Sequence, residues 1–181
     1  MKLKLIHMKN IVLILLLSFN YVFAQEVLSP VISIMGIKPI AVEVDGKSSE
    51  EIYSSVKKWV LQSYKNPEEV LKVDLPNEQI RVNGYKPSMY SGYGLGNREF
   101  PVDVEYSLII DIKEGRYRFS FEIIKEIGSD GMSSRPITIF FKKDGSIRKG
   151  AEPQIKSMNN SLSLMNMDIY NAIMGNSKDE W

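Results

Sequence analysis

The sequence contains no cysteine and a single histidine, His7. The absence of cysteine excludes disulfide bonds, thiol nucleophiles and cysteine-based metal sites. His7 lies in an N-terminal stretch with the features of a secretory signal peptide, so cleavage would leave a chain with neither imidazole nor thiol. Serine–histidine–aspartate and cysteine–histidine catalysis would then be excluded, together with every histidine-based metal site. We therefore predict no catalytic residue, no metal site and no cofactor.

The signal peptide is predicted from three consecutive features. Three lysines precede an apolar run at residues 11–17, and Val22 and Ala24 then occupy positions −3 and −1 of a secretory cleavage site. The apolar run is much shorter than the ~20 residues that a membrane-spanning helix needs. We therefore expect residues 1–24 to be a cleaved signal peptide, which leaves an exported chain without a membrane span.

The chain that remains is almost balanced in charge. Removing 24 of the 181 residues leaves 157, and removing three of the 23 basic residues leaves 20 against 22 acidic ones. Nucleic-acid-binding proteins carry a surplus of basic residues, so no nucleic-acid partner is predicted. The residue after Ala24 is Gln25, not cysteine, which excludes a lipoprotein. The expected location is the periplasm or the extracellular space.

The first half of the chain predicts a strand followed by a helix. An apolar lead-in at residues 25–39 precedes an alternating segment at residues 40–44, which is typical of a strand. Ser48 and Glu51 then have the spacing of a capping box at a helix start, and Asn66-Pro67 ends the helix. We predict one domain over residues 40–175, followed by a tail at residues 176–181.

Several antiparallel strands are predicted next. Two short strands at residues 70–74 and 79–83 flank a turn, and strict alternation from Val102 resumes after Glu114-Gly115. A two-residue turn there places Lys113 opposite Arg116, and one register then puts all the apolar side chains on one face. The same register pairs Asp111 with Arg118 on the other face.

The last third of the chain predicts a strand, a turn and a helix. We expect a strand at residues 137–141, a turn at Asp144-Gly145 with a short return strand, and an amphipathic helix at residues 153–175. The main elements follow the order β-α-β-β-β-β-α. Helices packed on one face of an antiparallel sheet make an α+β fold.

Two segments resemble a known protein family. The first runs from Val42 to Tyr53 and continues to Lys58-Trp59, and the second is the hairpin at residues 104–118, with its Lys-Glu-Gly-Arg-Tyr turn. Both are similar to a family of exported proteins, mostly from Bacteroidota, known as a domain of unknown function with a fold like that of TATA-box-binding protein (TBP-like). The resemblance implies a curved antiparallel sheet backed by helices. It implies neither DNA binding nor any catalytic residue.

The strongest candidate for a binding site is a segment rich in glycine and tyrosine at residues 84–99. It has no hydrophobic period and is predicted to be a loop, with Tyr85, Tyr90 and Tyr93 as ligand-binding residues. Tyrosine joins a large apolar ring to a polar tip, so these side chains could contact a glycan, a small molecule or an envelope protein. The alternative is an ordinary loop without a binding role.

The other candidates have structural alternatives. Asp103, Glu105 and Asp111 share one strand face, compatible with a hydrolytic carboxylate pair or a Ca²⁺ site, or with plain surface exposure. Serine and lysine three residues apart occur twice at residues 54–58, where a solvated helix face is the simpler interpretation. Four methionines of the last helix either fill the core or form an adaptable binding surface: Met158, Met165, Met167 and Met174.

These observations leave three hypotheses. The first is a non-enzymatic binding module in the periplasm or at the cell surface. The second is a hydrolase or a Ca²⁺-dependent, glycan-acting protein that uses carboxylates. The third is a structural component of an envelope assembly.

Overall fold

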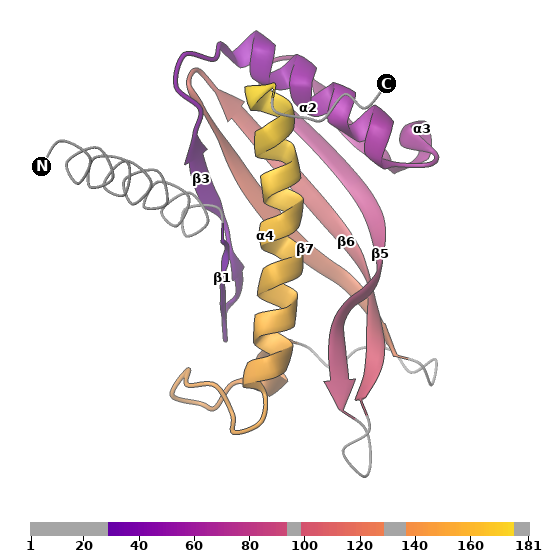
Figure 1. The fold of residues 1–181 in the computed structure, drawn as a ribbon, viewed down its shortest axis with the longest axis vertical. Helices are drawn as coiled ribbons and strands as arrows, with labels where there is room; N and C mark the ends of the chain where they lie inside the picture. The colour runs from indigo at the N-terminus through magenta and orange to yellow at the C-terminus, as the bar shows by residue number, and fades with distance from the viewer. Residues whose placement is uncertain (1–28, 94–98, 129–136, 176–181) are drawn as a thin grey trace, which may run out of the picture.

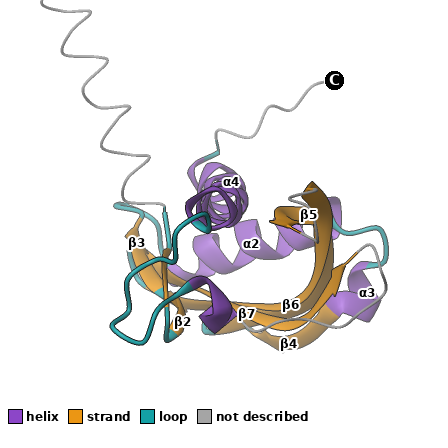
Figure 2. Ribbon diagram, turned by 90° about the horizontal axis from the view of Figure 1, so that it is seen from below, coloured by secondary structure: helices purple, strands orange, loops and turns teal. Residues whose placement is uncertain are grey.

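The main architectural feature of the computed structural model is a curved five-stranded antiparallel sheet (Figures 1 and 2). The structure describes residues 29–93, 99–128 and 137–175. The strand order is β3-β7-β6-β5-β4. The strands span Ile40–Glu43 (β3), Leu71–Leu75 (β4), Gln79–Tyr93 (β5), Glu99–Lys113 (β6) and Arg116–Gly128 (β7).

Two helices lie in the concave side of this sheet, as Figure 2 shows. They are α2 (Ser49–Ser63) and α4 (Glu152–Met174), and a short helix, α3 (Pro67–Val70), lies beside β4 and β5. The five strands and the two long helices follow the predicted order β-α-β-β-β-β-α. The α+β fold class predicted from the sequence is confirmed.

The β6–β7 hairpin has the register predicted from its two alternating faces. Lys113 lies opposite Arg116 across the Glu114-Gly115 turn, and Gly115 has the positive φ of 69° that such a turn requires. The predicted ion pair also forms, with 2.8 Å between Nη2 of Arg118 and Oδ2 of Asp111.

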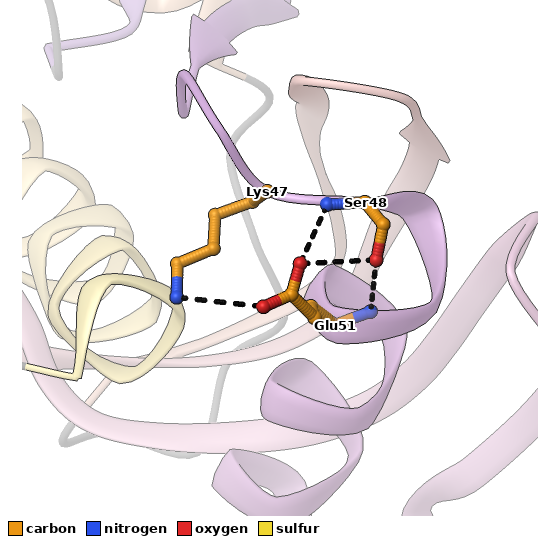
Figure 3. Close-up of polar contacts among 3 residues, drawn as sticks. All are labelled: Lys47, Ser48 and Glu51. Atoms are coloured by element: carbon orange, nitrogen blue, oxygen red, sulfur yellow. Dashed lines mark hydrogen bonds and ion pairs between the residues drawn. The ribbon is translucent and has the colours of Figure 1, made fainter.

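The start of α2 is stabilised by the predicted capping box (Figure 3). The amide of Glu51 donates to Oγ of Ser48 at 3.2 Å, and the amide of Ser48 donates to Oε2 of Glu51 at 2.9 Å. The hydrogen bonds that the amide and the hydroxyl of Ser48 donate to this carboxylate lower the pKa of Glu51. Two amides that the helix itself cannot satisfy are thereby paired.

The helix α4 contributes an apolar stripe to the core. Its fully or nearly fully buried apolar residues are Met158, Leu162, Met165, Ile169 and Ile173. The buried amide of Asn166 interrupts this stripe and accepts a hydrogen bond of 2.9 Å from the hydroxyl of Tyr117 on β7. Met158 and Met165 are therefore core residues, as their spacing predicts, while Met167 and Met174 are half-buried at its border. None of the described helices is long and apolar enough to cross a membrane.

The prediction of a loop over residues 84–99 is wrong. β5 continues to Tyr93, and its partner β6 starts at Glu99. A bulge at residues 87–89 interrupts the pairing, because Lys86 lies opposite Val104 and Tyr90 opposite Val102. This irregularity removes the alternation that would have indicated a strand.

The prediction of a strand at residues 137–141 is also wrong. Ile137–Phe140 form a 3₁₀ helix, η1, and only Phe141 makes an isolated bridge, to Ile147. The predicted turn between them is present, with Gly145 at φ 84°. A short apolar run does not distinguish a strand from a buried helical turn, which explains the error.

The predicted lead-in contains a small hairpin of its own. β1 (Val31–Ser33) and β2 (Gly36–Lys38) pair with each other as a separate two-stranded sheet. The apolar side chains of Ile32, Ile34 and Ile37 pack against the main core. The packed core therefore extends N-terminal of Ile40, where the sequence predicts the domain to begin.

Candidate functional site

The structure places the three predicted tyrosines in different surroundings. Tyr85 has 53% of its surface exposed, and its hydroxyl donates a hydrogen bond to Asp103 on the outer face of the sheet. Tyr90 is buried on the core side, edge-on to Phe140 with 5.8 Å between ring centroids. The side chain of Tyr93 lies outside the described residues. Tyr85 and Tyr90 do not form one stacking surface, and a role of the tyrosines in binding stays a prediction.

Asp103 holds the bulge of β5 in place. Its carboxylate accepts hydrogen bonds from the hydroxyl of Tyr85 and, at 2.8 Å, from the amide of Ser88. Ser88 has a φ of 49°, in the left-handed region that serine seldom adopts. These two hydrogen bonds lower the pKa of Asp103, and the bond to Asp103 raises the pKa of Tyr85. The carboxylate of Asp103 therefore has a structural role, because it stabilises the bulge of β5.

The other carboxylates of this strand face do not converge on a reaction centre either. Asp111 accepts from Nε2 of Gln79 at 2.6 Å and from Nε of Arg118 at 2.9 Å. Glu105 lies opposite Tyr85 on one side and Lys125 on the other. Within residues 29–93, 99–128 and 137–175, no cluster of three acidic or histidine side chains is arranged to hold a metal ion.

The first serine–lysine pair of α2 has a lysine that is already engaged. Nζ of Lys57 donates to Oδ2 of Asp74 at 2.8 Å and to the hydroxyl of Tyr53 at 3.2 Å. These bonds raise the pKa of Lys57, with that to Asp74 the larger cause. A lysine held in its protonated form cannot accept a proton from Ser54, so this pair is a surface feature of the helix.

A feature that the sequence does not reveal is a free edge on β7. The pairing of β3 with β7 covers only Arg116–Phe119 and ends where Ile40 lies opposite Phe119. The preceding strand, β2, pairs with β1 instead. In the described part of the chain, no strand pairs with this edge of β7 beyond Phe119. Part of its backbone is therefore left without a sheet partner.

This edge lines a hollow of about 540 Å³ between β7, the β1–β2 hairpin and η1. The hairpin and the residue after it contribute Met35, Gly36, Ile37 and Pro39, and η1 contributes Ile137. From β7 come Ser120, Phe121, Glu122, Ile123, Ile124 and Glu126. The volume is within the range of small-molecule sites, and the lining is predominantly apolar.

Glu126 is the unusual residue of this hollow. Only 4% of its surface is exposed, and its Oε1 has no hydrogen-bond partner among the described residues. A bulge between Ile123 and Lys125 changes the register of β7, so that Glu126 lies opposite the buried Val104. Burial raises the pKa of Glu126, and a hydrogen bond with Tyr90 acts in the opposite direction. Burial also raises the pKa of the Tyr90 hydroxyl, and the neighbouring carboxyl of Glu126 raises it further.

Sequence reasoning missed Glu126 for an identifiable reason. Up to Ile123 the strand alternates apolar and polar residues, and simple continuation assigns residue 126 to the wet face. The only signal of a change is the adjacent pair Ile123-Ile124, which breaks the alternation. In the structure, Ile124 is the extra residue of the bulge and is 54% exposed.

Comparison with known proteins confirms the family resemblance. The model of a family described as "Domain of unknown function (DUF4468) with TBP-like fold" matches residues 40–126. A crystal structure of a DUF4468 family protein from Bacteroides ovatus superposes with a TM-score of 0.62 at 15% identity, covering 81% of this chain and 90% of that one. A TBP-like protein from Parabacteroides distasonis gives a TM-score of 0.51 at 15% identity, covering 76% and 91%.

These similarities establish a TBP-like α+β fold. They indicate nothing about a ligand, because the sequence identities are only 15%. No curated protein matches the chain. The family has no known function, so the site has to be interpreted from its own geometry.

Proposed function

Because residues 40–126 match a family of unknown function, we propose that this chain is an exported, non-enzymatic binding module and that the hollow at the free edge of β7 is its ligand site. The observation that carries the proposal is a hollow of about 540 Å³ with a predominantly apolar lining, at an edge of β7 that no described strand covers beyond Phe119. A concave and mostly apolar site of this size is typical of sites that bind small molecules.

The apolar lining supports a small molecule as the ligand. Removing apolar surface from water is the main favourable term when such a molecule binds, and the walls contain Ile37, Phe121 and Ile137. The carboxylates of the outer sheet face that could support hydrolysis are engaged in hydrogen bonds at Asp103 and Asp111. The geometry thus favours binding over catalysis.

A neutral apolar dye tests whether the hollow binds ligands. We expect Nile red to bind the wild-type protein, and Ser120→Trp to weaken binding about tenfold or more, because the indole would occupy the space of the dye. Titration followed by dye fluorescence measures both affinities. Leu164→Trp introduces the same indole side chain at an exposed site on α4 outside the hollow and is expected to leave the affinity unchanged. Equal loss in both variants, or no binding by the wild type, would contradict the assignment of the site.

Export is a separate part of the proposal and has its own test. Expressed from residue 1 in a bacterium with a general secretory pathway, the protein is expected outside the cytoplasm without residues 1–24. Intact-mass spectrometry of the fractionated protein measures the cleavage position. Ala24→Leu should prevent cleavage, because the position before the cut requires a small residue. A full-length wild-type chain confined to the cytoplasm would show that the N-terminal segment is not a signal peptide.

A further inference from the structure

The free edge of β7 is formed by the backbone groups of Phe121 and Ile123. In an antiparallel sheet, hydrogen-bonded and non-hydrogen-bonded pairs of opposite residues alternate along two neighbouring strands. The amide of Ile112 on β6 donates to the carbonyl of Glu78 at 2.7 Å, on the side of β5, and Tyr117 lies opposite Ile112 on β7. The backbone groups of Tyr117 therefore point away from β6, toward β3. The same direction recurs at every second residue up to the bulge, and thus at Phe121 and Ile123.

No described strand pairs with these two residues on that side. The pairing of β3 with β7 ends where Ile40 lies opposite Phe119, and the preceding strand, β2, pairs with β1. Within residues 29–93, 99–128 and 137–175, no backbone–backbone hydrogen bond outside the β6–β7 ladder involves Phe121 or Ile123. Both residues line the hollow, so this side of β7 opens into it.

From this geometry we propose that the ligand of the hollow is a short peptide in an extended conformation, which pairs antiparallel with β7 where β3 no longer covers it. The inference rests on the proposed function, because it names the ligand class of the same site. The peptide supplies hydrogen-bond partners to the N–H and the C=O of Phe121 and of Ile123. In this mode of recognition, main-chain hydrogen bonds provide affinity and the alternate side chains provide specificity.

The lining of the hollow predicts the side chains of this peptide. The peptide residues opposite Phe121 and Ile123 point to the core side, where the walls contain Ile37 and Ile137, so apolar side chains fit there. The residue between them lies opposite Glu122, whose side chain is exposed. Among the described residues, no lysine or arginine lines the hollow. A basic side chain opposite Glu122 forms a favourable cross-strand pair, so the predicted pattern is apolar–basic–apolar.

A second copy of this chain is the main competing occupant, because two free edges can pair with each other. The register that pairs Phe121 of one copy with Ile123 of the other places Glu122 opposite Glu122. Like charges directly opposite each other destabilise a pair of strands. A separate peptide with a central basic residue avoids this repulsion, and it is therefore preferred.

The test uses the capped peptide acetyl-Thr-Val-Lys-Val-Thr-amide, titrated into the full chain by calorimetry. An ester oxygen in place of the backbone N–H of either valine should weaken binding about three- to tenfold, because this N–H donates to β7. The same replacement at the lysine is the matched control. The N–H of the lysine points away from β7, so the affinity should change less than about twofold.

A charge exchange tests the position of the central residue. Replacing the lysine of the peptide by glutamate should weaken binding to the wild type about three- to tenfold, and Glu122→Lys should reverse this preference. Glu78→Lys makes the same change of charge at an exposed residue of the turn before β5, outside the hollow. This control variant should keep the preference of the wild type.

Hydrogen exchange followed by NMR examines the edge without any substitution. In the protein without peptide, the amides of Phe121 and Ile123 should exchange faster than those of Ser120 and Glu122, which point toward β6. Added peptide should slow the exchange of Phe121 and Ile123. Slow exchange of these two amides in the absence of peptide would mean that the edge is already covered, and it would overturn the inference.

The remaining outcomes separate the inference from the proposed function. Nile red binding without peptide binding, or equal effects of the ester at valine and at lysine, would overturn strand addition and leave the hollow as a site for other small molecules. A stable dimer in sedimentation equilibrium, with both edge amides protected, would show that a second copy covers the edge. Absence of both dye and peptide binding would refute the proposed function itself.

Discussion

Replacing Leu162 by alanine is expected to lower the free energy of unfolding by about 2–5 kcal/mol, the range for a fully buried leucine whose removal leaves a cavity. Leu162 lies at the middle of the apolar stripe of α4, which packs on β5 and α2. The surrounding side chains are held by the sheet and cannot close the space. Urea unfolding of the two proteins, followed by circular dichroism, measures the difference.

Leu164→Ala is the matched control for this experiment. The residue is two positions further along the same helix and 65% exposed, so the same substitution should change stability by less than about 0.5 kcal/mol. Similar small effects at both positions would mean that α4 does not complete the core. The comparison is informative because α4 lies outside residues 40–126, which match the family model.

The parts of the fold that the sequence predicts correctly are those where two independent requirements agree. In the β6–β7 hairpin, the apolar face and the pair Asp111–Arg118 select the same register. In α2, the capping residues Ser48 and Glu51 precede an apolar period that starts at Ile52. The helix at residues 152–174 has both a sustained apolar period and a terminal glycine, Gly175, with a φ of 75°.

The parts that the sequence does not predict depend on irregular strands. The bulge beside Tyr90 makes a long strand look like a loop, and the bulge at Ile124 turns Glu126 toward the core. A bulge changes which face a side chain occupies, and this change depends on pairing with a strand far away in the chain. The sequence therefore predicts Tyr90 as a ligand-binding residue on a loop, although it is a buried residue of β5.

The hollow could not be predicted at all, because it forms between segments that are distant in sequence. The hairpin at residues 31–38, the edge of β7 and η1 meet only in the folded chain. Its existence also depends on where β3 stops covering β7, at Ile40. Sequence patterns describe single elements well, but they do not report the extent of pairing between two elements.

The second large effect is expected from Glu126→Gln, which should stabilise the fold at alkaline pH by about 1–3 kcal/mol, the cost of a buried group without its partner. Burial raises the pKa of Glu126 in the folded state above its unfolded value. The favourable contribution of the protonated form is therefore fully present below the unfolded pKa and is lost as the pH rises through the folded pKa. Glutamine resembles the protonated carboxyl at every pH, so the variant does not suffer this loss.

Urea unfolding of both proteins at about pH 4 and about pH 8 measures this difference. The two proteins should have similar stability at the lower pH, and the variant should be more stable at the higher one. Glu122→Gln, at the exposed carboxylate of the same hollow, should show no such divergence. A pH-independent difference would mean that the Glu126 carboxyl keeps its ordinary pKa in the folded protein.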